Sequence, residues 1–314
     1  MRVHVVANLR ARGLSIPGDR LERLRDICRG RATVHETRSV SELGGVMREV
    51  VTHQADLLIL AGGDGTFMSG VSALAPHVAE GRWPRLGLLP MGTVGTVARN
   101  LGDRRRPDVL LREWLDAPRA AHAVPRPTLR VRARRNGAEE ERIGFIVGTG
   151  LVARFFELYE AGGAGGIPLA GKLVARIFAE SFTGGPMARR VLTPIPCELE
   201  VDGERRPLEG VSLLCAAVVR DLGLGMKVCY RAAEHPDRFH LVASGLPPSK
   251  LGPRAPLVMM GRSIGGENHV DDLVGRFVVR FPGGVGPYVL DGDSFQAESF
   301  EVSAGPLIPI VAPG

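Results

Sequence analysis

Hydrophobic and polar positions follow two alternating patterns over roughly the first 120 residues. Short apolar runs predict strands at Val3–Ala7, Thr33–Thr37, Asp56–Leu60 and Arg85–Leu89. The segments between them, Asp19–Cys28, Ser41–His53 and Thr66–Glu80, have the spacing of amphipathic helices. Strands that alternate with helices predict a parallel sheet with helices wound on both faces.

The pattern changes after residues 117–125, which have the composition of a linker. Beyond it, β-rich runs predict strands at Thr128–Ala133, Arg142–Val147, Cys197–Val201, Val211–Val219, Phe239–Ala243, Arg276–Phe281, Tyr288–Leu290 and Phe300–Val302. Many short strands between Gly, Pro and Asp turns favour a sandwich or barrel-like domain. We therefore expect an α/β domain at 1–122 and a β-rich domain at 123–314. The second domain carries a helical insertion at about 152–182, and the last residues can pack back on the first domain.

The composition limits the kinds of binding partner that we expect. The formal net charge is +6, but only Lys172, Lys227 and Lys250 are lysines, a bias typical of a GC-rich genome. A mildly cationic surface attracts anionic lipid headgroups. Nucleic acid is disfavoured, because aromatic residues are only 5% and the arginines are scattered.

The cysteines and the apolar segments indicate the compartment. None of the four cysteines forms a Cys-x-x-Cys pair, which is typical of reduced core residues in an intracellular protein. The first residues have a strand pattern rather than that of a signal peptide, and the longest apolar stretch, Val211 to Val219, is too short to span a bilayer. We expect a cytoplasmic protein with peripheral membrane contact.

The run Leu57 to Thr66 carries the strongest chemical signal. An apolar strand enters the turn Gly62-Gly63-Asp64-Gly65-Thr66, and such turns bring backbone N–H groups and a helix N-terminus to phosphate. The run lacks the Lys-Ser/Thr pair of a Walker loop and the spacing of the dinucleotide fingerprint. Asp64 would repel phosphate unless a metal ion, a proton or an incoming hydroxyl lies between, which favours phosphoryl transfer. The alternative is an ordinary turn with Asp64 as a helix cap.

A second glycine-rich turn follows the next predicted strand. Gly92 and Thr93 offer N–H groups and a hydroxyl to phosphate or ribose, and Arg99 follows one to two helical turns later. Two such turns on adjacent strands would form a crevice of nucleotide size. Alternatively, Gly92 only permits a tight turn and Arg99 is a solvated charge.

Asp291 and Asp293 flank Gly292 near the C-terminus. Asp-Gly is also the signature of a tight hairpin, which is the alternative interpretation. Phosphoryl transfer to an alcohol needs a proton acceptor and a divalent metal. Asp291 could be the base and Asp293 a metal or water ligand, with Asp64 competing for the role of base.

In this order, the three motifs resemble the diacylglycerol kinase catalytic family, which includes sphingosine and ceramide kinases. The resemblance implies an α/β nucleotide domain like that of NAD kinase and phosphofructokinase, a β-sandwich domain, ATP and Mg²⁺. Asn8 is similar to that family's N-terminal Asn-Pro turn, although Leu9 replaces proline.

The departures from the family pattern concern polar groups. Gly95 and Thr96 replace the usual Asn-Asp pair, and Asp293 stands where glutamate is usual. The acid after Gly150 is missing, which argues against a free amine substrate. Only Asp237 matches the segment near the family's structural Mg²⁺ site, so that metal is doubtful.

We therefore expect an ATP- and Mg²⁺-dependent kinase that phosphorylates the primary hydroxyl of a neutral lipid at a membrane surface. Ceramide, another sphingolipid or diacylglycerol would be the acceptor. The alternatives are an NAD kinase-like or phosphofructokinase-like enzyme with a soluble substrate, and a non-catalytic nucleotide-binding protein. The oligomeric state stays open, with a homodimer as one option.

Overall fold

The chain forms two compact units, named unit 1 (residues 1–126 with 307–314) and unit 2 (residues 127–306). The computed structural model describes residues 1–11, 14, 19–79, 81–92, 96–100, 105–162 and 166–312. Residues from both ends of the chain thus build unit 1.

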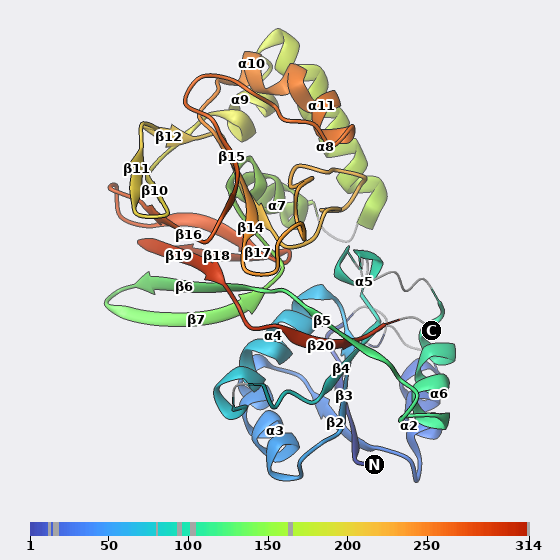
Figure 1. Ribbon diagram of the computed structural model, residues 1–314. Helices are drawn as coiled ribbons and strands as arrows, with labels where there is room; N and C mark the ends of the chain where they lie inside the picture. The colour runs from blue at the N-terminus through green and yellow to red at the C-terminus, as the bar shows by residue number, and fades with distance from the viewer. Residues whose placement is uncertain are drawn as a thin grey trace. The chain divides into compact units, whose positions relative to one another are not determined.

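Unit 1 is a six-stranded sheet with helices on both faces (Figure 1). In sheet order the strands are β2 (Thr33–Thr37), β1 (Val3–Asn8), β3 (Leu57–Gly62), β4 (Arg85–Pro90), β20 (Ile308–Val311) and β5 (Ala123–Arg126). Neighbouring strands run parallel, except that β5 is antiparallel to β20. All six residues of β3 are buried, as expected for a central strand covered on both sides.

The longer helices of unit 1 bury one apolar stripe each. The helical segments are α2 (Arg20–Cys28), α3 (Val40–Thr52), α4 (Asp64–Leu74), the 3₁₀ turn η1 (Ala75–His77), α5 (Thr96–Asn100) and α6 (Pro107–Asp116). In α3, the buried residues Leu43, Met47 and Val50 recur at helical spacing. The predicted helix Thr66–Glu80 begins earlier, at Asp64, and ends at Leu74, where Pro76 follows in η1.

The linker predicted at residues 117–125 is wrong in part. Its last residues enter β5, which pairs with β20 from the far end of the chain. Backbone N–H and C=O groups beside an open sheet edge gain partners by pairing, and composition does not reveal such a partner.

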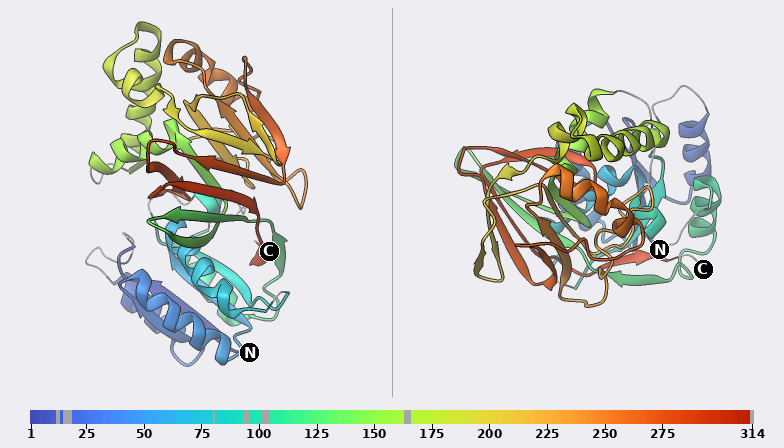
Figure 2. Two further views of the ribbon diagram at one scale, coloured as in Figure 1. Left: turned by 90° about the vertical axis from the view of Figure 1, so that its left-hand side faces the viewer. Right: turned by 90° about the horizontal axis from the view of Figure 1, so that it is seen from above.

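Unit 2 contains two six-stranded antiparallel sheets (Figure 2). The first has the order β11 (Glu204–Arg206), β10 (Glu198–Val201), β16 (Arg276–Arg280), β19 (Ser299–Ala304), β6 (Leu129–Arg135) and β7 (Ala138–Gly144). The second has the order β15 (Val270–Val274), β14 (Phe239–Ser244), β13 (Leu213–Ala217), β8 (Ile146–Gly150), β17 (Gly286–Leu290) and β18 (Asp293–Ala297). Two short strands, β9 (Ile195–Pro196) and β12 (Gly210–Val211), form a separate two-stranded sheet.

Aromatic side chains join the two large sheets of unit 2. The ring centroids of Phe239 and Phe277 lie 5.9 Å apart, and those of Tyr288 and Phe300 lie 5.0 Å apart. In each pair one ring comes from each sheet, so the sheets share a core. The predicted fold class, an α/β domain followed by a β-sandwich domain, is confirmed.

A helical layer covers the second sheet of unit 2. It comprises α7 (Leu151–Ala161), α8 (Gly166–Thr183), α9 (Pro186–Leu192), α10 (Pro248–Leu251), the 3₁₀ turn η2 (Gly252–Arg254) and α11 (Ala255–Met259). Helix α7 packs on β8, β13 and β17, and Ile177 of α8 joins the same apolar cluster as Leu213 and Cys215. Helix α7 begins directly after Gly150, the last residue of β8.

Candidate active site

The carboxyl ends of β1, β3 and β4 carry the predicted phosphate-binding residues. Strand order reverses at β1, because β2 lies on one side of it and β3 on the other. In parallel sheets, ligands bind beyond the carboxyl ends of the strands at such a reversal. The side-chain amide of Asn8, at the end of β1, donates a 2.7 Å hydrogen bond to Thr66 Oγ1 in the first turn of α4. Asn8 and the first glycine turn therefore meet at the reversal point.

The two glycine turns touch through their backbones. Met91 N–H donates a 2.7 Å hydrogen bond to Gly62 O. A Cβ at Gly92 would lie 2.6 Å from Gly63 Cα, and one at Gly62 would lie 2.3 Å from Thr66 Oγ1. Side chains are excluded at both positions, so close approach, and not only turn geometry, explains these glycines. Gly63 precedes α4 directly, and Gly65 lies within its first turn.

The Asp64 carboxylate links the two turns. Its Oδ2 accepts a 2.6 Å hydrogen bond from Thr96 N–H, and its Oδ1 accepts a 3.1 Å bond from Val97 N–H. These donors belong to the first turn of α5, so Asp64 caps a helix other than its own. Thr93 and Gly95 lie outside the described residues, as does the side chain of Arg99, whose backbone lies in α5.

Asp291 occupies the turn between β17 and β18 in unit 2. Asp291 and Gly292 have φ values of 49° and 94°, which are typical of a two-residue hairpin turn with both residues left-handed. The hairpin alternative is thus correct for the backbone. The side chain nevertheless turns inward, and Asp291 is only 8% exposed.

Backbone N–H groups hold the Asp291 carboxylate. Ile146 N–H donates to Oδ1 at 2.8 Å, and Phe145 N–H lies 3.0 Å from Oδ2 and 3.1 Å from Oδ1. Phe145 is the residue between β7 and β8, so the single strand predicted at Arg142–Val147 is split there. A Cβ at Gly144 would lie 2.6 Å from Asp291 Oδ2. At this point the backbone leaves the strand pairing, and two of its N–H groups donate to one aspartate.

Asp293 lies at the exposed start of β18, paired across the hairpin with Leu290. No group of three His, Cys, Asp or Glu side chains among the described residues could hold a metal ion. Mg²⁺ usually retains several waters and binds through one or two carboxylates and the substrate phosphates. Asp293 is compatible with that mode of binding.

The loop around Asp237 does not fit a structural metal ion. Asp237 is exposed, and other groups tie the loop down. Tyr230 donates to Asp271 Oδ2 at 3.2 Å, and His240 Nε2 lies 2.7 Å from Asp271 Oδ1. Arg231 N–H faces His240 Nδ1 at 3.3 Å, so Nε2 of His240 carries its proton and donates it to Asp271. A metal ligand at Nε2 would need the opposite tautomer.

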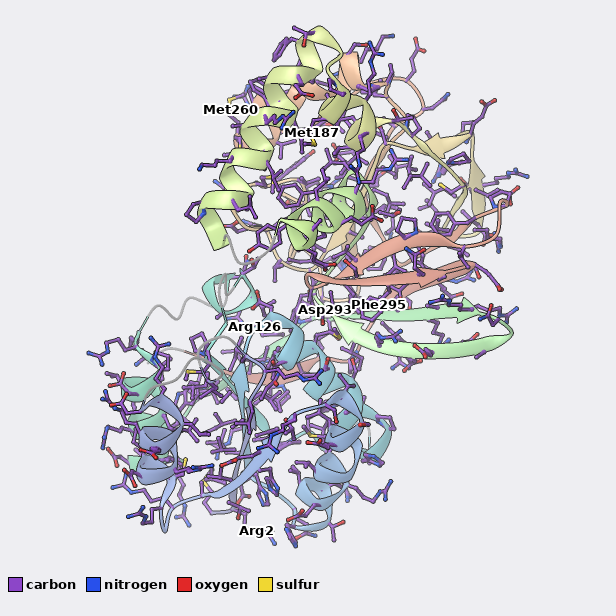
Figure 3. All side chains as sticks on the ribbon, turned by 180° about the vertical axis from the view of Figure 1, so that it is seen from behind. Arg2, Arg126, Met187, Met260, Asp293 and Phe295 are labelled. Carbon is purple, nitrogen blue, oxygen red and sulfur yellow. The ribbon has the colours of Figure 1, made fainter. Side chains whose placement is uncertain are left out.

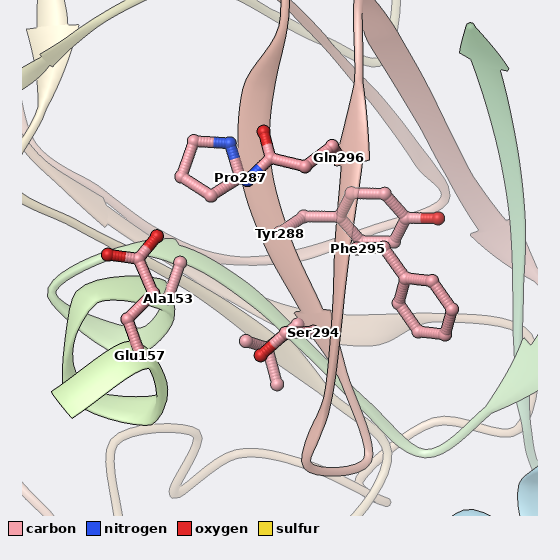
Figure 4. Close-up of a pocket in the computed structure, with 8 residues that line it drawn as sticks. Ala153, Glu157, Pro287, Tyr288, Ser294, Phe295 and Gln296 are labelled. Atoms are coloured by element: carbon pink, nitrogen blue, oxygen red, sulfur yellow. The ribbon is translucent and has the colours of Figure 1, made fainter. Parts of the chain in front are cut away.

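Sequence patterns did not reveal this polar network or a pocket beside α7. A cavity of about 80 Å³ lies between α7 and the β17–β18 hairpin, with Glu157, Ser294 and Gln296 among its lining residues (Figure 4). Ser294 also donates a 2.9 Å hydrogen bond to Glu160 Oε1. Glu157 is one helical turn after Ala153, which is the signal that could have placed it on the same face. Burial raises the pKa of Tyr288, so this phenol lines the pocket as a neutral group.

Comparison with known proteins identifies relatives of the first part of the chain. Residues 2–122 match the sequence model of the diacylglycerol kinase catalytic domain. The diacylglycerol kinase of Bacillus subtilis (strain 168) is 38% identical over 78 residues, which are 25% of this chain and 24% of that protein. The match thus spans about a quarter of that relative's length. The resemblance predicted from the three motifs is confirmed, and the matched segment contains the two glycine turns but not Asp291-Gly292-Asp293.

The fold of the whole chain also has solved counterparts. A diacylglycerol kinase from Bacillus anthracis str. Sterne matches with a TM-score of 0.63 at 15% identity, covering 99% of this chain and 97% of that one. A second structure from that organism, also attributed to a diacylglycerol kinase, gives a TM-score of 0.69 at 16% identity over 99% and 97%. These likenesses show the fold alone. In the described part of the chain, no helix is long and apolar enough to cross a membrane.

Proposed function

We propose that the protein is a lipid kinase that transfers the γ-phosphoryl group of ATP to the primary hydroxyl of a neutral lipid. The observation that carries the proposal is the pair of glycine turns joined at the carboxyl edge of unit 1, within the segment that matches the diacylglycerol kinase catalytic domain. Diacylglycerol is the first acceptor to test, because the matched relative is named for it. Ceramide and other sphingolipids are the next.

In this proposal, unit 1 binds the nucleotide. The N–H groups of the turns at Gly62–Thr66 and Gly92, with Thr93, Arg99 and the N-terminus of α4, hold the ATP phosphates. Asn8 orients Thr66 through their hydrogen bond. Asp64 fixes α5 against the first turn, so that both turns keep one geometry. Asp293 would hold Mg²⁺, which would neutralise charge on the transferring phosphoryl group.

Asp291 is the proposed general base. Two backbone N–H donors fix its carboxylate. It accepts the proton of the lipid hydroxyl as the hydroxyl oxygen bonds to the γ-phosphorus of ATP and the bond from that phosphorus to the β,γ-bridging oxygen breaks, which releases ADP. Phosphoryl transfer depends mostly on alignment and charge neutralisation, and a base adds about 10²- to 10⁴-fold. Gly144 leaves room for this arrangement, because a Cβ there would lie 2.6 Å from Asp291 Oδ2.

The test uses labelled ATP with diacylglycerol, ceramide, NAD and a sugar phosphate as acceptors. Label in the organic phase supports a lipid kinase, and the lipid that carries it names the acceptor. Label in NADP or the sugar phosphate contradicts the proposal, as does ATP binding without any transfer.

Asp291→Asn tests the base directly. We expect the rate to fall at least 10²-fold with little change in ATP affinity. Asp272→Asn, an exposed carboxylate on β15, is the matched control and should keep the wild-type rate. Thermal unfolding of both variants checks that the fold is retained. Wild-type turnover in Asp291→Asn would remove this residue from the mechanism.

A further inference from the structure

The helices of unit 2 beyond α7 concentrate the positive charge of the chain. The segments α8, α9, α10, η2 and α11, called the helical face, contain six basic residues and one acidic residue. Their net charge is +5, compared with +6 for the whole chain. The elements contact one another, because η2 packs on α8, and α10 packs on both α8 and α9. Nearly all the excess charge therefore lies on one layer.

The single acid of the helical face is engaged within it. Glu180 accepts a 2.7 Å bond from Arg176 Nε and a 2.6 Å bond from Met187 N–H at the start of α9. Lys172, Arg189 and Lys250 are exposed and have no ion pair within the part of the chain that the structure describes. By contrast, arginines on the first sheet are paired, such as Arg132 with Glu141 and Arg280 with Glu200.

The same layer exposes large apolar side chains. Phe182 is 61% exposed, Met259 50%, and Met260, which directly follows α11 and is counted with the helical face, 56%. Phe182 is the one aromatic among the exposed large apolar residues of the described part, and its ring meets Phe178 edge to face at 5.0 Å. Ser181 of α8 touches Gly252 of η2, which places the end of α8 against the segment that leads to the methionines. Figure 3 labels Met260 and Met187 on this layer.

We propose that the helical face docks on an anionic lipid bilayer. Basic residues attract acidic headgroups, and apolar side chains enter the boundary between headgroups and acyl chains. A nucleic acid would use the charge but not the methionines. The inference rests on the proposed function only in that a lipid acceptor lies in a membrane.

The test is sedimentation with vesicles of phosphatidylcholine alone and of phosphatidylcholine mixed with phosphatidylglycerol. We expect wild-type protein to bind the mixed vesicles and to be released by salt. Lys250→Gln with Arg254→Gln should weaken binding about 25-fold, since each basic residue near the surface contributes about fivefold. Phe182→Ser with Met260→Ser should weaken it about tenfold or more. Arg134→Gln with Arg135→Gln on β6 is the matched control and should bind like wild type.

Two outcomes would overturn the inference. One is equal binding, or no binding, to the two kinds of vesicle. The other is loss of binding in the β6 control to the same extent as in the helical-face variants. Retention on single-stranded DNA without retention on vesicles would instead assign the face to nucleic acid.

Kinase assays on acceptor lipid in neutral detergent micelles separate this inference from the proposed function. The helical-face variants should keep the wild-type rate there and lose it on mixed vesicles. If wild-type protein transfers no phosphate in either system, the proposed function fails while the sedimentation result still decides the docking.

Discussion

At the scale of single residues, Asp64 has a different setting from Asp291. Asp64 accepts hydrogen bonds from two backbone donors of α5, whereas Asp291 accepts from the junction of β7 and β8. Both carboxylates accept hydrogen bonds from backbone N–H groups and so fix the local backbone. Sequence alone left the role of base open between them, because spacing does not show which donors each side chain meets.

Asp64→Ala should weaken ATP binding about tenfold and lower the free energy of unfolding by about 1–2 kcal/mol. The physical reason is that two N–H groups at the start of α5 lose their acceptor. Calorimetric titration and urea denaturation measure the two effects. Asp108→Ala, which removes a first-turn acid of α6, is the matched control and should leave ATP affinity unchanged. If Asp64→Ala binds ATP normally, is fully stable and lacks turnover, Asp64 is the base instead of Asp291.

At the scale of elements, the contact between the two glycine turns leaves room for a side chain at Gly63 but not at Gly92. A Cβ at Gly92 would meet backbone at 2.6 Å, whereas one at Gly63 would find its nearest neighbour at 3.5 Å. We therefore expect Gly92→Ala to destabilise the protein by about 1–3 kcal/mol and Gly63→Ala to be nearly neutral. Urea denaturation of both variants is the measurement. Equal losses would show that the turns do not pack as described.

Most elements of unit 1 were predictable because their patterns are strong, whereas β5, β20 and α6 were not predicted. Buried parallel strands read as continuous apolar runs, and α3 repeats its apolar residues at helical spacing. Four strands of unit 2, β9, β11, β15 and β18, were not predicted, and the last two were missed for the opposite reason. Strand β18 has exposed polar residues at most positions, and β15 contains two acids, so neither reads as a strand.

Long-range polar contacts were beyond sequence patterns. The split of the predicted strand at Phe145 depends on Asp291, which is 146 residues away. The Asp271 network likewise joins Tyr230, His240 and His269 from three segments. Local periodicity does not predict partners that are so distant in the sequence. The hairpin turn at Asp291-Gly292, by contrast, could be predicted from those two residues alone.

At the scale of the whole molecule, the two units differ in their buried ionisable groups. In unit 1, His4 stacks on His35 at 5.2 Å, and burial lowers the pKa of both, with the neighbouring histidines adding to the effect. In unit 2, burial would raise the pKa of Asp271, but hydrogen bonds from His240, His269 and Ser263 outweigh it and hold the pKa well below its usual range. The units should therefore respond to acid in different pH ranges.

The histidine pair makes unit 1 the more acid-sensitive unit. A histidine whose folded pKa lies below its ordinary value of 6.5 stays neutral in the fold, while the unfolded chain takes up protons first. The histidine pair therefore leaves the free energy of unfolding unchanged above about pH 6.5 and lowers it as the pH falls below that value. Asp271 contributes stability that is complete above its ordinary value of 3.8 and is lost only below that. Between these values only unit 1 should weaken.

Urea denaturation at pH 7 and pH 5 tests this difference. Both tryptophans, Trp83 and Trp114, lie in unit 1, so their fluorescence follows unit 1, while far-ultraviolet circular dichroism follows both units. We expect the fluorescence midpoint to move to lower urea at pH 5 and a later dichroism phase to stay in place. His4→Gln with His35→Gln should flatten the fluorescence shift, because the titrating rings are gone. A fluorescence midpoint that does not move, or a dichroism phase that moves with it, would contradict the assignment of acid sensitivity to unit 1.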